Sequence, residues 1–224
     1  MTQFNINNST IEQINDKGNN IKLVSNSGNN AVSEQGAITQ TAGSLSTKER
    51  LFIDDIESFS KVRNISPSTV APVLKGGYLD IAEDAVQTAL EQILAVAFHK
   101  KDWGGEGNDL YTANVLVGGV RRPTAFLLKG NGLKKKVMEI KNCGKNGDQV
   151  VRLFQSPADL FVIQFVGNIS EAVIQHALGE VARLKTQGQE AHFMTIDGQD
   201  TARLLCAYGK LAVPLALPPS RRRE

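Results

Sequence analysis

The spacing of hydrophobic residues predicts regular structure through most of the second half of the chain. Residues 80–99 carry apolar side chains three or four positions apart, which is typical of an amphipathic helix. Apolar runs at 110–117, 124–128 and 160–166 are typical of strands. The last two runs lack polar alternation, so we expect those strands to be buried on both faces beneath helices.

Helices and strands continue to alternate after these runs. The pattern predicts helices at 148–154 and 170–185, a strand at 192–196 and a last helix at 200–208. Alternation of this kind is typical of an α/β fold. We therefore predict an α/β domain over residues 76–212, with a mixed sheet flanked by helices.

Residues 1–43 form a separate region that is rich in Asn, Gln, Ser, Thr and Gly. Short alternating runs lie between Gly-Asn breaks, which predicts β-prone segments separated by turns. One copy has too few apolar residues for a core, so copies from several chains would have to stack as paired strands with Asn ladders. The alternative is a disordered polar tail. The alternating runs are residues 4–6, 11–14, 21–24 and 37–39.

Residues 44–75 are predicted as a helical linker between this tail and the α/β domain. Ser46 and Glu49 have the spacing of a capping box. Apolar residues follow at helical spacing, which predicts a helix over 47–63. A shorter helix is expected at 66–74, and neither helix carries recognisable chemistry.

Composition narrows the class of protein. Hydrophobic residues make up 41% of the chain and charged residues 21%, as in globular proteins, and the net charge of +2 is too small to indicate nucleic-acid binding by itself. Cys143 and Cys206 lack CxxC spacing, so a structural zinc site is unsupported. The polar start is no signal peptide, and no run reaches the roughly 18 apolar residues of a membrane span. We therefore expect no membrane partner and a cytoplasmic location, with residues 213–224 as a disordered basic tail.

A carboxylate and an amine are placed to meet at neighbouring strand ends. Asp109 opens the strand at 110–117, and Lys129 closes the strand that follows a polar turn at 118–123. Hydrolysis of a phosphodiester requires an acid that holds a divalent metal and a cation or base that orients water. Taken singly, Asp109 after Gly-Asn is also typical of a turn residue, and Lys129 of a solvated strand end.

This order of elements resembles the PD-(D/E)XK nuclease superfamily, and within it the Mrr-type restriction endonucleases, over residues 76–166. The resemblance implies a restriction-endonuclease-like fold and a nuclease that depends on Mg²⁺ or Mn²⁺. It identifies Asp109 as the metal-binding aspartate and Lys129 as the lysine of the D/E-x-K motif. Glu83 is similar to a helical glutamate that reaches the metal, and Gln149 to an accessory glutamine of some members.

One position departs from that motif. The family has an acid, or sometimes Gln, two residues before the lysine, and this chain has Leu127. Leucine cannot bind a metal, so either Glu106 or Glu83 supplies the missing ligand, or the site is inactive. The alternative function is then an inactive nuclease-fold protein that binds nucleic acid and recruits or scaffolds partners.

Basic residues follow the predicted site, and Glu139 is the one acid between positions 119 and 147. Such an excess would neutralise phosphates and give salt-sensitive binding of nucleic acid. The resemblance to restriction endonucleases implies that this nucleic acid is DNA rather than RNA. A solvated loop has the same composition. The residues assigned to nucleic-acid binding are Arg121, Arg122, Lys134, Lys135, Lys136, Lys141, Lys145 and Gln149.

The N-terminal tail resembles the assembly tails of some bacterial defence proteins. This resemblance implies an antiviral effector that forms a homo-oligomer or recruits a partner through residues 1–43. A self-assembling structural protein, with the α/β domain as cargo, is a third hypothesis.

Overall fold

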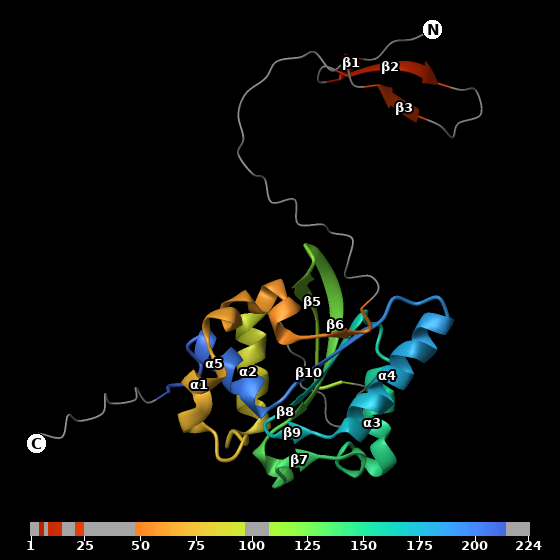
Figure 1. The fold of residues 1–224 in the computed structure, drawn as a ribbon. Helices are drawn as coiled ribbons and strands as arrows, with labels where there is room; N and C mark the ends of the chain where they lie inside the picture. The colour runs from red at the N-terminus through yellow and green to blue at the C-terminus, as the bar shows by residue number, and fades with distance from the viewer. Residues whose placement is uncertain (1–4, 7–8, 15–20, 25–47, 97–107, 214–224) are drawn as a thin grey trace, which may run out of the picture. The chain divides into compact units, whose positions relative to one another are not determined.

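The chain divides into two units, Met1–Gln40 and Thr41–Glu224, which are described separately. Figure 1 shows a computed structural model of the chain. The structure describes residues 5–6, 9–14, 21–24, 48–96 and 108–213. Residues 214–224, which include most of the predicted basic tail, lie outside this part.

The described part of the first unit is a three-stranded antiparallel sheet. Its strands β1 (Asn5–Ile6), β2 (Ser9–Ile14) and β3 (Ile21–Val24) pair in the order β1-β2-β3. Three of the four predicted alternating runs therefore contribute paired strands. The fourth, residues 37–39, lies outside the described part.

The second unit is built on a mixed five-stranded sheet with the order β4-β10-β8-β6-β5. β5 (Leu110–Val117) and β6 (Val120–Lys129) form an antiparallel hairpin. β8 (Leu160–Phe165), β10 (His192–Ile196) and β4 (Arg50–Leu51) extend it as parallel strands. All six residues of β8 are buried, as expected for a strand covered on both faces. The predicted α/β class and mixed sheet are confirmed.

Helices cover both faces of this sheet. Figure 1 shows α3 (Asp148–Leu153) and α4 (Glu171–Thr186) on one face. α2 (Glu83–Ile93) and α5 (Gly198–Ala207) lie on the other, with α1 (Pro67–Val70) beside α5. α3 joins β6 to β8 and α4 joins β8 to β10, so each of these parallel pairs is linked by a helical crossover. No helix of the described residues has the length and apolar character to cross a membrane.

α2 is shorter than the helix predicted over 80–99. It ends at Ile93, and Ala95 has a φ of 50°, in the left-handed region that does not continue an α-helix. Residues 97–99 lie outside the described part. Between β6 and α4, short elements accompany α3 and β8: they are η4 (Asn131–Leu133), β7 (Val137–Met138), η5 (Ile140–Asn142), η6 (Lys145–Gly147) and β9 (Asn168–Ile169), where η denotes a 3₁₀ helix.

The segment predicted as a linker is instead part of the α/β unit. In place of the helix over 47–63, the structure has β4 followed by η1 (Ile53–Asp55) and η2 (Glu57–Asn64). The shorter helix expected at 66–74 is present as α1 and η3 (Ala71–Val73). Buried residues in η1, in η2 and at the residue that joins them recur every third position, which matches the three residues per turn of a 3₁₀ helix. They are Ile53, Ile56, Phe59 and Val62.

This segment also covers the outer edge of the sheet. Ser58 Oγ donates to the Asn114 carbonyl at 3.2 Å and accepts from the Leu116 amide at 2.8 Å. The Glu57 carboxylate accepts from the Gly118 amide at 2.9 Å. These side chains satisfy backbone groups of β5, an edge strand, and of the turn that follows it, which do not pair with another strand.

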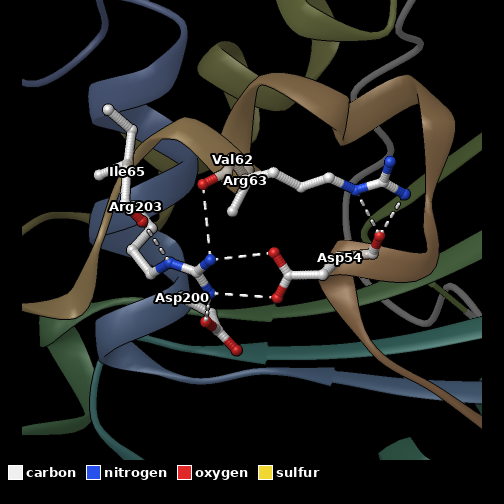
Figure 2. Close-up of polar contacts among 6 residues, drawn as sticks. All are labelled: Asp54, Val62, Arg63, Ile65, Asp200 and Arg203. Atoms are coloured by element: carbon white, nitrogen blue, oxygen red, sulfur yellow. Dashed lines mark hydrogen bonds and ion pairs between the residues drawn. The ribbon is translucent and has the colours of Figure 1, made fainter.

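Arg203 on α5 fixes the same segment against the helices (Figure 2). Its guanidinium pairs with Asp54 at 3.0 Å and with Asp200 at 2.8 Å. Arg203 Nε also donates to the Ile65 carbonyl at 2.9 Å. Because the Arg203 side chain is only 12% exposed, water competes weakly for these contacts. One cation thus joins η1 and the end of η2 to α5.

Replacing Arg203 by Met should lower the free energy of unfolding by about 2–3 kcal/mol, because partly buried Asp200 loses its cation. Urea denaturation followed by circular dichroism measures the change. Arg183→Met is the matched control, since the Arg183 side chain is 43% exposed and its pair with Glu180 on α4, where water competes for the guanidinium, contributes less than about 1 kcal/mol. Equal losses in the two variants would contradict a special role for Arg203.

Candidate active site

The hairpin of β5 and β6 brings Asp109 to Lys129. The strands are antiparallel and place Leu110 opposite Phe126, so the start of β5 lies beside the end of β6. The Asp109 amide donates to the Phe126 carbonyl at 2.8 Å, and the Asp109 carboxylate accepts from the Leu128 amide at 2.6 Å. Backbone groups of β6 therefore hold the Asp109 side chain at this edge of the sheet.

Glu83 reaches the same edge from the first turn of α2. Gly130, directly after β6, permits this approach, because a Cβ at that position would overlap the Glu83 backbone nitrogen. The Gly130 amide also stabilises the ionised Glu83 carboxylate and so tends to lower its pKa. The Asn131 amide donates to the Ile81 carbonyl at 2.9 Å and fixes the residues that lead into α2.

The Lys129 amine contacts both carboxylates. Its Nζ is 3.7 Å from Glu83 Oε2 and 4.0 Å from Asp109 Oδ2. The Lys129 side chain is 15% exposed, whereas those of Asp109 and Glu83 are 29% and 38% exposed. The three side chains that the sequence placed in one site thus lie together, and solvent reaches both carboxylates.

Burial raises the pKa of Glu83 above its usual value. The Lys129 amine opposes this increase by stabilising the carboxylate, and the neighbouring Asp109 carboxylate adds to it. With both acids ionised, two negative charges share one amine. A further cation would relieve the repulsion between the carboxylates.

Among the described residues, the Glu83 and Asp109 carboxylates are the side chains at this site that could bind a metal ion. Leu127 lies on the same face of β6 as Lys129 and is 3% exposed, so it is a core residue that adds no ligand. Glu106 lies outside the described residues. Among the residues that the structure describes, no group of three or more Asp, Glu, His or Cys side chains is arranged to hold a metal. Mg²⁺ is often held by one or two carboxylates with waters and substrate phosphates, so Glu83 and Asp109 fit that ion.

The predicted phosphate-binding residues divide between the two ends of β6. Lys134–Lys136 are exposed on the loop that follows Lys129, at the same edge of the sheet as the site. Arg121 and Arg122 lie at the other end, where Arg122 is separated from Lys129 by roughly 23 Å of strand. Arg122 is buried and pairs with Glu190 at 2.7 Å. The prediction placed Arg121 and Arg122 in one group with the loop lysines. The structure separates them, because β6 lies between the arginines and the loop.

The remaining predicted residues follow further along the chain. Lys141 pairs with Glu139 at 2.6 Å, and Lys145 is exposed. Gln149 is half-buried in the first turn of α3, where its backbone amide donates to the Cys143 carbonyl at 3.0 Å. Burial raises the pKa of Cys143 to about 11, so its thiol stays protonated near neutral pH and is a poor nucleophile.

Sequence analysis missed Gln164 and Asp80 near the site. The Gln164 side chain accepts from the Lys129 amide at 3.4 Å, and Asp80 accepts from the Asn131 side chain at 2.8 Å. Gln164 lies within the apolar run at 160–166, which indicated a core strand. The sequence feature that could have identified Gln164 is its polar side chain within a run that is otherwise almost entirely apolar.

No protein-family model matches the chain, and neither a curated protein nor a solved structure matches it. The positions of Glu83, Asp109 and Lys129 are the basis for the function proposed below.

The raised pKa of Glu83 should make stability depend on pH. The folded state binds this proton more tightly than the unfolded state, so ionising Glu83 lowers the free energy of unfolding. Stability from this group is therefore lost as pH rises from the ordinary glutamate pKa of about 4.3 through the raised value. The Glu83→Gln variant has no such ionisation. The difference in free energy of unfolding, variant minus unmodified protein, should therefore become more positive as pH rises from about 4 to about 7. Urea denaturation at both pH values measures the difference, and a constant difference would contradict the prediction.

Proposed function

We propose that this chain is a metal-dependent nuclease that cleaves phosphodiester bonds in DNA. The observation that carries the proposal is the Lys129 amine within 4.0 Å of carboxylates from two separate elements, at one edge of a mixed sheet. An amine and two acids open to solvent are groups that metal-assisted hydrolysis of a phosphodiester uses. The order of the elements that carry Glu83, Asp109 and Lys129 also supports a restriction-endonuclease-like fold.

Each side chain has a separate role in this proposal. Glu83 and Asp109 would hold Mg²⁺ or Mn²⁺, an ion that polarises a phosphoryl oxygen and lowers the pKa of water when bound. Lys129 contacts a phosphate oxygen and stabilises the negative charge that develops in the transition state. Because both carboxylates already contact the Lys129 amine, little rearrangement is needed before the reaction.

The exposed lysines after β6 support a nucleic-acid substrate. Lys134–Lys136 lie on the loop that begins one residue after Lys129, so they would contact phosphates close to the scissile one. Contacts of this kind are electrostatic and independent of sequence, and they weaken as salt concentration rises.

A second candidate function is binding of nucleic acid without cleavage. The buried side chain of Leu127 favours it, since an acid two residues before the lysine would have given the metal a third protein ligand. In that case the loop lysines still bind DNA, and the protein recruits or scaffolds partners.

Asp109→Asn and Lys129→Met should each lower Mg²⁺-dependent cleavage of plasmid DNA by about 100-fold or more, because each removes a charge that the transition state requires. Asn keeps an oxygen that can accept from the Leu128 amide, so the backbone contact of residue 109 is retained. Gel electrophoresis of plasmid over time measures the rate. Lys185→Met is the control, because Lys185 lies near the end of α4, pairs with Glu49 at 3.8 Å and belongs neither to the proposed site nor to the lysine loop, so this variant should cleave normally.

A gel shift in EDTA separates the two candidate functions. An unmodified protein that shifts DNA but does not cleave it with Mg²⁺ or Mn²⁺ supports the binding function. Cleavage that is as fast in Asp109→Asn as in the unmodified protein would contradict the proposed site.

We propose further that the first unit assembles copies of the chain, or recruits a partner, as part of an antiviral defence. A three-stranded sheet needs a hydrophobic face or a packing partner to be stable alone, and stacking of copies would pair the edges of this sheet and bury its apolar residues. Assembly would bring several α/β units onto one stretch of DNA, which increases their effective concentration.

Removing residues 1–43 should convert an oligomer into a monomer, because the strands that pair between copies are lost. Light scattering after size-exclusion chromatography measures the mass. The shortened chain should keep its cleavage rate at saturating DNA, since the candidate site lies wholly within the second unit. An unchanged oligomer would contradict the assembly role.

A further inference from the structure

Gln164 is a polar residue in the middle of the sheet. β8 reads Leu-Phe-Val-Ile-Gln-Phe, and Gln164 is 1% exposed. A buried amide costs free energy unless its donor and acceptor groups are paired. Here both are paired: Oε1 accepts from the Lys129 amide at 3.4 Å, and Nε2 donates to Thr201 Oγ1 at 3.0 Å.

The Thr201 hydroxyl determines which way this amide faces. Thr201 Oγ1 donates its one proton to the Asp197 carbonyl at 2.6 Å, so toward Gln164 it can only accept. Nε2 of Gln164 must therefore face Thr201, which leaves Oε1 to face Lys129. Thr201 is 1% exposed, so water does not compete for these bonds. A directed chain of hydrogen bonds runs from Lys129 to Asp197.

The Asp197 end of this chain is fixed to β8. Asp197 caps α5 by accepting from the Asp200 amide at 2.9 Å. The Gly198 amide donates to the Gly167 carbonyl at 2.9 Å, and a Cβ on Gly198 would overlap the Val166 carbonyl. The start of α5 is thus seated closely against the end of β8 and gives the chain a rigid support.

Lys129 is the last residue of β6, and a strand end has fewer ladder contacts than a strand centre. The Lys129 carbonyl accepts from the Val166 amide at 3.2 Å, and the register of β6 with β8 places the Gln164 backbone carbonyl opposite the Lys129 amide. The Gln164 side chain is a second acceptor for the same amide. Both polar backbone groups of the residue that carries the amine are therefore held by β8.

We infer that Gln164 and Thr201 are positioning residues of the proposed active site: they hold the backbone of Lys129 so that its amine stays beside Glu83 and Asp109. The inference rests on the proposed function for its catalytic consequence. Neither residue needs to touch DNA or a metal, because both act through Lys129.

The test compares the double variant Gln164→Leu/Thr201→Val with Thr201→Ser in the full chain. Replacing both partners of a buried hydrogen bond by apolar groups of similar shape can leave stability nearly unchanged. The double variant therefore removes the hydrogen-bond chain from a folded protein, which urea denaturation verifies. Should it not fold, Gln164→Met alone takes its place, because the Thr201 hydroxyl then keeps its bond to the Asp197 carbonyl and no buried donor is left unpaired. Thr201→Ser keeps the hydroxyl and is the matched control.

For plasmid cleavage, kcat should fall about 10-fold in the double variant with KM unchanged, because a displaced catalytic amine slows the chemical step rather than binding. Thr201→Ser should keep both constants. A double variant that keeps the original kcat, or a control that loses as much as the double variant, would overturn the inference.

Labelling of amines tests the position of Lys129 without cleavage. Acetylation by acetic anhydride, read by mass spectrometry, should become about threefold faster at Lys129 in the double variant, because local opening exposes the amine. Lys185 is the internal reference, since it pairs with Glu49 at 3.8 Å and reports general loosening of the fold. Absence of nuclease activity in the unmodified protein would overturn the proposed function, but the labelling of Lys129 could still be measured. Unchanged labelling of Lys129 in the double variant would overturn its positioning by Gln164 and Thr201.

Discussion

The antiparallel pairing of β5 with β6 is the constraint on which the candidate site depends. Asp109 and Lys129 are 20 positions apart in the sequence, yet the register that pairs Leu110 with Phe126 brings their side chains to 4.0 Å. A shift of this register by two residues would keep every side chain on its own face of the sheet but separate the two groups by roughly 7 Å more. The pairing, rather than nearness along the chain, therefore encodes the site, and the Asp109 carboxylate reinforces it by accepting from the Leu128 amide.

α5 connects this edge of the sheet to the segment that precedes α1. Near its start, Thr201 supports the Gln164 side chain, and two residues later Arg203 pairs with Asp54. Residues 48–65 pair with β10, cover β5 and contact α5, so they contribute to the core although their sequence indicated a linker. α5 therefore carries contacts both to this segment and to the Gln164 side chain.

The sequence predicted local structure well and long-range pairing poorly. The strand at 192–196 was found with its predicted bounds, because a short apolar run between polar segments determines a buried strand locally. The helix over 47–63 was wrong, since periods of 3 and 3.6 residues differ little over a few turns and the pairing of β4 with β10 joins distant parts of the chain. Asp109 and Lys129 could be placed together because each lies at a predicted strand end. Arg122 could not be separated from the loop lysines by counting charges, because its distance from them depends on the ten-residue length of β6.

Under the proposed function, Leu127 would set a balance between stability and metal binding at this site. A carboxylate at that buried position would add a third negative charge near one amine, and burial already raises the pKa of Glu83. Leucine avoids the cost of burying a third carboxylate and packs in the core. It leaves Glu83 and Asp109 as the carboxylates among the described residues that would hold a metal ion. Under the proposed function, an ion held by two carboxylates needs waters and a substrate phosphate to complete its coordination. Metal and DNA would then bind cooperatively, and the leucine that packs in the core of the free protein would leave the metal weakly bound until a phosphodiester also binds.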